Sequence, residues 1–327
     1  MFKPGEVIGS YRLSHIIGSG NSASVFLAQH LYQHSLNVAI KIRARTQGQH
    51  ETILAQRFSE SARLQFQFCH PNIAWLYETI ETDEFQALVI EYLPGGTLSN
   101  YLYKRNTYID LEQACLLGVY LADGLEHMHD IQVIHRDIKP DNILFEDPQL
   151  IGSVRIADFD VSKNPYTSPN LTEKGAHVGT LCYTAPEQFN QEKPRAIADV
   201  YSLGMVLYEV IARRLPFDSL SAPAVFSRFL DDAPLPLLSQ FVPTVSPGLD
   251  WIIEKSITTK SEERIPSAAT LASLLLAVSP YAFSHFQRTK IIRLQTHLNW
   301  LKENIYLTSS DVQRELVSGL KNIGLNL

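Results

Sequence analysis

The most informative eight residues of the chain are His135-Arg136-Asp137-Ile138-Lys139-Pro140-Asp141-Asn142. They provide a carboxylate at Asp137, an ammonium two residues further on and a carboxamide five residues further on. Groups of this kind can orient a hydroxyl, neutralise a phosphate during transfer and hold Mg²⁺. We therefore expect this segment to handle phosphate chemistry.

Two motifs follow this segment toward the C-terminus. Asp158-Phe159-Asp160 begins twenty-one residues after Asp137, and Ala185-Pro186-Glu187 lies further along the chain. A third pattern, Glu262-Glu263-Arg264-Ile265-Pro266, lies close to residue 280. Motifs in a fixed order are more informative than any one of them alone.

Two further motifs precede the segment. Gly18-Ser19-Gly20 opens a loop that ends at Val25, and its glycines allow backbone N–H groups to approach phosphate oxygens. Taken alone, such a loop is more often an ordinary hairpin turn, and its third glycine is replaced by Ala23. Lys41 ends the apolar run Val38-Ala39-Ile40, where it would either face a phosphate or project into solvent.

The pattern of apolar residues changes near residue 94, at Pro94-Gly95-Gly96. Before it we expect one helix over 51–68 and short strands over 11–17, 24–29, 37–43 and 86–91. After it we expect helices over 111–129, 199–212, 224–230, 249–257 and 268–277. This layout predicts an α+β fold with a β-rich lobe (1–93), a larger helical lobe (94–280) and a helical tail (281–327). A ligand site is expected where the two lobes meet.

Together, these motifs make residues 10 to 280 resemble a protein kinase of the Ser/Thr type, in the compact style of bacterial kinases. The resemblance implies a two-lobed protein-kinase fold and the use of ATP and Mg²⁺. It implies that Asp137 is the catalytic base and that Lys139 stabilises the γ-phosphate. It also assigns Mg²⁺ to Asn142 and Asp158, and the α- and β-phosphates to Lys41.

The resemblance further implies an adenine site between the lobes. Its phosphate loop would be formed by Gly18, Ser19 and Gly20. Its hinge would be Ile90, Glu91 and Leu93, with Ile90 at the back of the pocket. The apolar walls around the ring would be Val25, Ala39 and Leu144. Elsewhere, Glu187 would pair with Arg264, and Asp199 would hold the catalytic loop from a buried helix.

A helix glutamate should pair with Lys41 in such a fold, and its position is ambiguous. The usual spacing, nine residues before His70, gives Ser61, whereas Glu60 is one residue away. Glu60, Leu64 and Phe68 recur at i, i+4 and i+8, which favours Glu60 on the inner face. We therefore predict Glu60 as the partner; the alternative is that Glu60 faces solvent and Lys41 lacks this partner.

Regulation is less well defined by the sequence. Asp160 stands where the resemblance would place a glycine, which puts a negative charge close to the metal site. Arg136 indicates a pocket for an activation-loop phosphate, and Thr172 is our candidate for autophosphorylation. A loop that is ordered without phosphate is the alternative.

The tail carries a second pattern. Ile291, Leu294, Leu298, Leu301 and Ile305 recur at helical spacing, which predicts one apolar helix face. We expect that face to pack on the chain's own large lobe. Packing on a partner protein or on a second copy of the chain is left open.

Composition excludes several classes of protein. The 327 residues are 45% hydrophobic and 19% charged, which predicts a globular protein. A formal net charge of −6 argues against a nucleic-acid coat or a membrane-surface binder. Three widely spaced cysteines fit a reducing compartment, so we predict a cytoplasmic protein without a membrane-spanning segment in this chain.

The leading functional interpretation is an ATP-dependent Ser/Thr protein kinase that acts on protein substrates and on itself. The main alternative is a nucleotide-binding pseudokinase that acts as a scaffold, which Ala23, Asp160 and the displaced Glu60 favour. Retention of the phosphate- and metal-contacting side chains favours the enzyme. A kinase for small molecules is a third option, and Ala185-Pro186-Glu187 argues against it.

Overall fold

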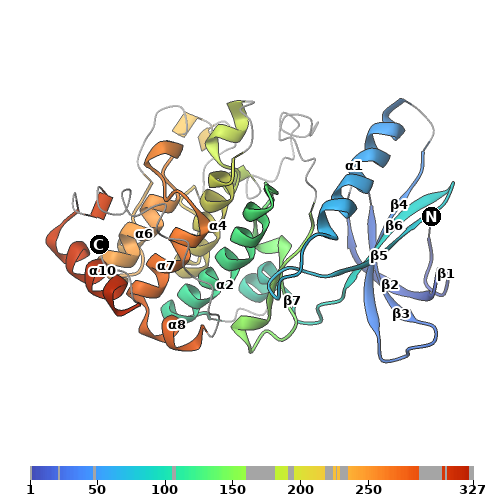
Figure 1. The fold of residues 1–327 in the computed structure, drawn as a ribbon, viewed down its shortest axis with the longest axis horizontal. Coiled ribbons are helices and arrows are strands. Elements are labelled where there is room, and N and C mark those ends of the chain that lie inside the picture. Colours follow the sequence, from blue (N-terminus) through green and yellow to red (C-terminus); the bar gives the residue numbers. More distant parts are fainter. Residues whose placement is uncertain are drawn as a thin grey trace.

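A computed structural model of the chain describes residues 2–20, 23–46, 49–104, 108–159, 181–190, 195–217, 224–225, 227–228, 235–286, 304–305 and 308–323. These residues form a β-rich lobe and a larger helical lobe, which lie side by side along the longest axis (Figure 1). The predicted α+β class and two-lobed arrangement are confirmed.

The β-rich lobe is built on an antiparallel sheet of six strands in the order β1-β2-β3-β4-β6-β5. The strands are β1 (Val7–Ile8), β2 (Tyr11–Ser19), β3 (Ser24–His30), β4 (Asn37–Ala44), β5 (Leu76–Glu81) and β6 (Phe85–Glu91). Side chains alternate between the two faces of a strand. In β4, Val38, Ile40 and Ile42 therefore enter the core of this lobe, and Lys41 and Arg43 share the opposite face.

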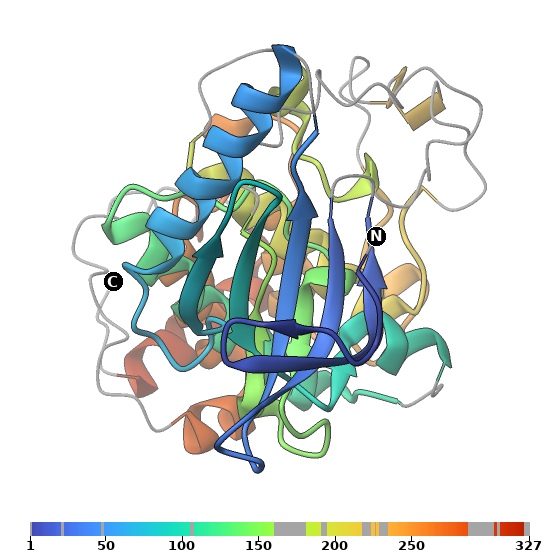
Figure 2. The same cartoon turned by 90° about the vertical axis from the view of Figure 1, so that its right-hand side faces the viewer.

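Helix α1 (Gln49–Gln65) lies on the side of this sheet that is turned toward the helical lobe (Figures 1 and 2). Ala62 and Phe58 of the helix pack against Leu76 of β5 and Leu88 of β6. The helix therefore lies between the sheet and the other lobe, next to the face that carries Lys41.

The helical lobe contains α2 (Leu111–Asp130), α4 (Ile197–Ala212), α6 (Pro247–Ser256), α7 (Ala268–Val278), α8 (Pro280–His285) and α10 (Ser310–Asn322). A small sheet joins β7 (Gly96–Thr97), β8 (Ile143–Phe145) and β9 (Val154–Ile156). Single-turn helices are η1 (Asn100–Lys104), η2 (Pro140–Asn142), η3 (Ile151–Ser153), η4 (Pro186–Asn190), η5 (Leu238–Gln240) and η6 (Ser261–Glu263).

Local sequence explains where the principal helices begin. Asp110 caps α2: its side chain accepts a hydrogen bond from the Gln113 amide, and the Gln113 side chain accepts one from the Asp110 amide. Ser246 and Ser267 cap α6 and α7 in a similar way, each by accepting one backbone hydrogen bond. Helix α4 is buried continuously from residue 198 to 211, so it forms the centre of the lobe.

The predicted helices over 111–129, 199–212, 249–257 and 268–277 agree with the structure to within two residues at each end. The four predicted strands are confirmed as well. Edge strand β5 was not predicted, because most of its side chains are polar and exposed and show no apolar alternation. The predicted helix over 224–230 is described only at 224–225 and 227–228.

The C-terminal helix α10 packs on the helical lobe through Val312, Leu316 and Leu320, which are buried. Glu315 accepts hydrogen bonds from Ser246 Oγ (2.6 Å) and from the Gly248 amide (2.8 Å) at the start of α6. Of the predicted apolar stripe in the tail, only Ile305 lies within the described residues, and it is buried.

Gly319 allows α10 to approach the backbone of α7. A Cβ atom at this position would lie 1.9 Å from the Ala277 carbonyl oxygen. We expect Gly319→Ala to lower the melting temperature, because the clash costs about 1–3 kcal/mol and outweighs the gain of about 1 kcal/mol in helix propensity. Thermal unfolding monitored by circular dichroism measures the effect. Ser318→Ala, on the exposed side of α10, is the matched control, and a rise in melting temperature for Gly319→Ala would contradict this packing.

Candidate active site

Asp199 of α4 anchors the segment between α2 and β8 that carries Asp137. The Asp199 carboxylate accepts hydrogen bonds from the backbone amides of His135 (2.9 Å) and Arg136 (2.8 Å). His129 Nε2 lies 2.8 Å from the same carboxylate. Arg136 has a left-handed φ of 67°, which costs energy for a residue with a side chain. The buried carboxylate therefore stabilises a strained loop, which agrees with the position that the resemblance implies for Asp199.

Burial of Asp199 opposes its ionisation, but the hydrogen bond and charge of His129, with the Arg136 amide, hold the pKa of Asp199 below its ordinary value. A lowered carboxyl pKa contributes stability above the unfolded-state pKa of about 4, and this is lost as pH falls through the folded-state pKa. We expect Asp199→Asn to cost at least about 1–3 kcal/mol at neutral pH and to weaken the loss of stability below pH ~4. Urea unfolding at several pH values tests this. If Asp199→Asn lost as much unfolding free energy as wild type when the pH is lowered, this expectation would be contradicted.

Asp137, Lys139 and Asn142 come together in one cluster. The Asn142 side-chain amide donates to the Asp137 carbonyl (2.7 Å) and to its carboxylate (2.8 Å). The Lys139 ammonium lies 3.0 Å from Asp137 Oδ2, the oxygen that also accepts from Asn142, and 3.1 Å from Oδ1. Helix η2 creates this geometry by turning the chain between Lys139 and Asn142. The Asp137 carboxylate is thus fixed by one amide and one cation.

Lys41 and Asp158 connect the two lobes. Lys41 Nζ lies 2.5 Å from Asp158 Oδ1, so a lysine of the six-stranded sheet is paired with an aspartate that follows β9. Asp158 has a left-handed φ of 62°. Aspartate tolerates this conformation better than most residues with side chains. The ion pair places a cation and a carboxylate at the point where the lobes meet.

Several of the residues predicted to bind the nucleotide lie along one face of the six-stranded sheet. Val25 is opposite Lys41, and Ala39 is opposite Ile90, so these four half-buried side chains share the face that carries the lysine. Leu93 is buried just after β6, and Leu144 is half-buried in β8. The Glu91 amide is bonded to the Trp75 carbonyl (2.8 Å).

Gly18, Ser19 and Gly20 form the end of the β2–β3 hairpin. Gly18 pairs with Val25, and Ser19 pairs with Ser24. The Gly20 amide donates to the Ala23 carbonyl (2.9 Å), which closes the turn. On either side of residues 21–22, the two strands are therefore paired as far as Gly20 and Ala23, close to Val25, which is opposite Lys41.

The predicted pairing of Glu60 with Lys41 is wrong in this structure. The Glu60 carboxylate accepts hydrogen bonds from Arg63 (2.8 and 3.0 Å) on the exposed side of α1. The inward face of the helix instead carries Ser61, Ala62 and Gln65. The spacing argument failed because α1 ends at Gln65, so Phe68 lies beyond the helix and does not report its phase.

A cluster of three aromatic rings joins the segment after α1 to the segment that carries Asp137, and the sequence analysis did not identify it. The Phe159 ring is buried and lies 5.1 Å from the Phe68 ring and 5.2 Å from the His135 ring. His135 Nε2 also lies 3.1 Å from the Ala157 carbonyl. The signal was available in part, since Phe159 and His135 belong to the quoted motifs.

The predicted pair of Glu187 and Arg264 is present. The Arg264 guanidinium is fully buried and donates to both carboxylate oxygens of Glu187 (2.7 and 3.0 Å). Asp160 and Thr172, on which the expectations about regulation rest, lie outside the described residues. In the part of the chain that the structure describes, no helix has the length and apolar character to span a membrane.

Comparison with known proteins identifies the family. Residues 11–276 match the sequence profile described as the protein kinase domain. The chain belongs to the protein kinase family. It is 30% identical over 263 residues to a protein named serine/threonine-protein kinase PrkC of Bacillus subtilis, covering 80% of this chain and 39% of that protein.

Two further relatives of this kinase chain have similar names. A probable serine/threonine-protein kinase PknB of Lactococcus lactis is 27% identical over 282 residues, which is 84% of this chain and 44% of that protein. The serine/threonine-protein kinase PknB of Mycobacterium leprae is 29% identical over 282 residues, or 85% of this chain and 44% of the relative. The match to this chain therefore spans less than half the length of each of these three relatives.

Among solved structures, Rad53 residues 1–466 in complex with AMP-PNP has the same fold. The TM-score is 0.66 with 21% sequence identity, and the match covers 84% of this chain and 65% of the Rad53 chain. This similarity supports the kinase fold of the chain.

Proposed function

We propose that this chain is an ATP-dependent kinase that transfers the γ-phosphoryl group to Ser and Thr hydroxyls of proteins. The proposal rests above all on the cluster in which Asn142 and Lys139 hold the Asp137 carboxylate. The names of the relatives support the choice of Ser and Thr, as does Lys139, which the sequence resemblance assigns to this class.

In this proposal Asp137 accepts the proton of the attacking hydroxyl. Its carboxylate is oriented by the Asn142 amide, so little reorganisation is needed when the hydroxyl arrives. The Lys139 ammonium lies beside the same carboxylate and stabilises negative charge on the transferred phosphoryl group. Proton acceptance and charge stabilisation are thus assigned to neighbouring side chains.

The nucleotide is assigned to the sheet face that carries Lys41. Val25, Ala39 and Ile90 offer an apolar surface to the adenine ring. Lys41 offers its ammonium to the α- and β-phosphates, and Gly18 and Gly20 have no side chains to obstruct the approach of the phosphates to the hairpin.

The donor set near Asp158 fits Mg²⁺. Mg²⁺ prefers oxygen ligands and binds through one or two carboxylates together with substrate phosphates and water. Asp158 supplies a carboxylate, and Asn142 uses its amide nitrogen toward Asp137, so its amide oxygen is the atom suited to a cation. When bound, the ion would neutralise the charge on the β- and γ-phosphates.

We extend the proposal to location and ligands. A cytoplasmic location is supported by the three cysteines, none of which forms a disulfide. The formal net charge of −6 supports a protein substrate rather than a nucleic acid. Association through the tail and dimerisation stay predictions from the sequence.

The test is transfer of radiolabelled phosphate from ATP to a generic Ser/Thr-containing protein, with nucleotide affinity measured in parallel by calorimetry. Label on the substrate that depends on Mg²⁺ is the expected result. Asp158→Asn is expected to lose most of the transfer. Tight, metal-dependent nucleotide binding without label on the substrate or on the chain would overturn the proposal in favour of a nucleotide-binding scaffold.

A further inference from the structure

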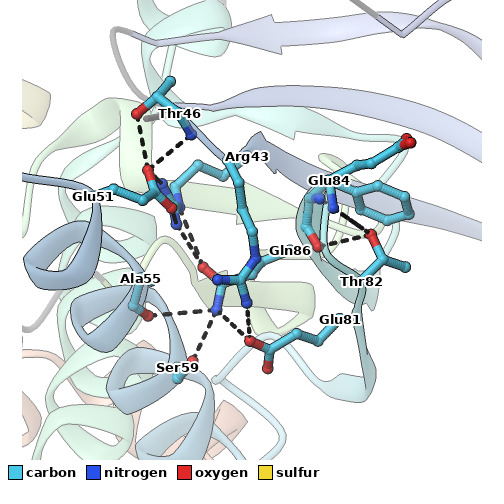
Figure 3. A network of polar contacts seen from close by, with 11 residues as sticks. Arg43, Thr46, Glu51, Ala55, Ser59, Glu81, Thr82, Glu84 and Gln86 are labelled. Carbon is cyan, nitrogen blue, oxygen red and sulfur yellow. Dashed lines mark hydrogen bonds and ion pairs between the residues drawn. The ribbon is translucent and has the colours of Figure 1, made fainter. Parts of the chain in front are cut away.

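Arg43 makes a buried connection between the six-stranded sheet and helix α1 (Figure 3). It lies two residues after Lys41 on the same strand and the same face. Its guanidinium donates two parallel hydrogen bonds to the Glu51 carboxylate, at 2.9 and 2.6 Å. Bidentate pairs of this kind are strong and fix the relative orientation of their partners.

Gln86 completes the connection. It is buried in β6 opposite Arg43, and its side-chain oxygen accepts from the Arg43 guanidinium at 2.8 and 3.3 Å. Its amide nitrogen donates to Ser59 Oγ (3.0 Å) and to the Ala55 carbonyl (3.4 Å) of α1. Glu51, Ala55 and Ser59 are four residues apart, so the contacts follow one side of the helix. We call Arg43, Glu51 and Gln86 the sheet clamp.

Glu51 is committed to this cluster. Besides Arg43, the amide and hydroxyl of Thr46 donate to its carboxylate at 3.0 and 2.9 Å (Figure 3). The hydrogen bonds from Arg43 and Thr46 lower the pKa of Glu51 to about 2. The carboxylate therefore stays ionised at neutral and at mildly acidic pH.

The remaining carboxylate of α1 does not tie the helix to the nucleotide face. Glu60 is paired with Arg63 on the exposed side, and Lys41 is paired with Asp158 of the other lobe. Among the described contacts of α1, the sheet clamp is the charged connection between the helix and the strand that carries Lys41.

Phe68 connects the C-terminal end of α1 to the neighbourhood of Asp158. The chain continues from α1 to Phe68, whose ring contacts Phe159, the residue next to Asp158. Gln65, at the end of the helix, donates to the Ala74 carbonyl (3.2 Å), which fixes the same end to the strand region. A shift of α1 would therefore move Phe68 and weaken its contact with Phe159, which is adjacent to Asp158 in the chain.

We propose that Arg43, Glu51 and Gln86 are positioning residues for phosphate transfer: they set the position of α1, and through Phe68 and Phe159 they set the position of Asp158. This inference rests on the proposed kinase function. The sheet clamp connects the sheet to α1, which is the connection that the sequence had predicted for a pair of Lys41 and Glu60.

Steady-state kinetics on the full chain test the proposal. Glu51→Gln keeps the shape of the side chain and removes its charge, and we expect kcat to fall about tenfold with a smaller change in the KM for ATP. The charge reversal Arg43→Glu/Glu51→Arg should recover only part of the loss, because an arginine at position 51 cannot accept hydrogen bonds from the amide and hydroxyl of Thr46. Arg63→Gln breaks an ion pair on the exposed side of the same helix and should leave kcat within about twofold.

Hydrogen exchange of the same variants provides a readout that does not depend on activity. Glu51→Gln should exchange faster than wild type in α1 and in residues 154–159, whereas Arg63→Gln should not. Wild-type kcat and exchange in Glu51→Gln would overturn the proposal, as would a larger loss of kcat in Glu60→Gln than in Glu51→Gln. A wild-type chain without transfer, combined with faster exchange in Glu51→Gln, would refute the kinase function while leaving the positional role of the clamp in place.

Discussion

Replacing Asp137 with asparagine is expected to lower kcat for phosphate transfer by about 10²–10⁴-fold and to leave the Kd for ATP nearly unchanged. The Asp137 carboxylate is the group positioned to accept a proton, held by Asn142 at 2.8 Å and by Lys139 at 3.0 Å. An asparagine has similar size but cannot accept the proton. The variant leaves Lys41 and the side chains assigned to the adenine ring unchanged, so nucleotide affinity should be retained. Single-turnover kinetics with parallel calorimetry separate the two effects.

The matched control is Asp83→Asn, in an exposed turn of the upper lobe between β5 and β6. It makes the same chemical change far from the cluster and should keep wild-type kcat. If Asp137→Asn retained kcat within a few-fold of wild type, Asp137 could not be the base and the assignment of the whole cluster would be wrong.

Replacing Arg264 with alanine is expected to remove about 3–5 kcal/mol from the free energy of unfolding. The guanidinium is fully buried, and it donates to Glu187 and to the carbonyls of Ile197, Thr258 and Thr259. Its removal leaves a carboxylate and three carbonyl groups without this donor in the interior. Guanidinium chloride unfolding gives the loss as a shift of the midpoint.

Two further variants identify the cause of that loss. Glu263→Gln breaks the exposed ion pair with Lys260 close to Arg264, and it should change stability by less than about 1 kcal/mol. The double variant Arg264→Met/Glu187→Leu removes both buried charges and should recover the part of the loss that comes from the unpaired Glu187 carboxylate. Stability of Arg264→Ala within 1 kcal/mol of wild type would show that the buried pair contributes little.

Much of the site could be predicted because its residues belong to short motifs with fixed spacing. Asp137, Lys139 and Asn142 lie within six consecutive positions, so local turn geometry at η2 brings them together. The long-range contact between Glu187 and Arg264 was predicted only through the resemblance to kinases. The principal helices were predictable because they are long runs rich in apolar residues, and polar residues cap the starts of α2, α6 and α7.

The sheet clamp could not be predicted in the same way. Gln86 lies 43 residues from Arg43 in the chain, and neither belongs to a recognised motif. Their meeting depends on the register between β4 and β6, in which Arg43 is opposite Gln86. Glu60 was misplaced for a related reason: the phase of α1 is set by packing of Ala62 and Phe58 on the sheet, and the end of the helix was assigned too late.

The most direct test of the central claim is the intact mass of a Ser/Thr-containing protein substrate after incubation with this chain, ATP and Mg²⁺. We expect added phosphate that fragmentation locates on Ser or Thr, and none when the metal is chelated or when Asp137→Asn replaces the wild type. Unmodified substrate and unmodified chain, under conditions in which calorimetry shows ATP bound, would contradict the assignment of this site to phosphate transfer.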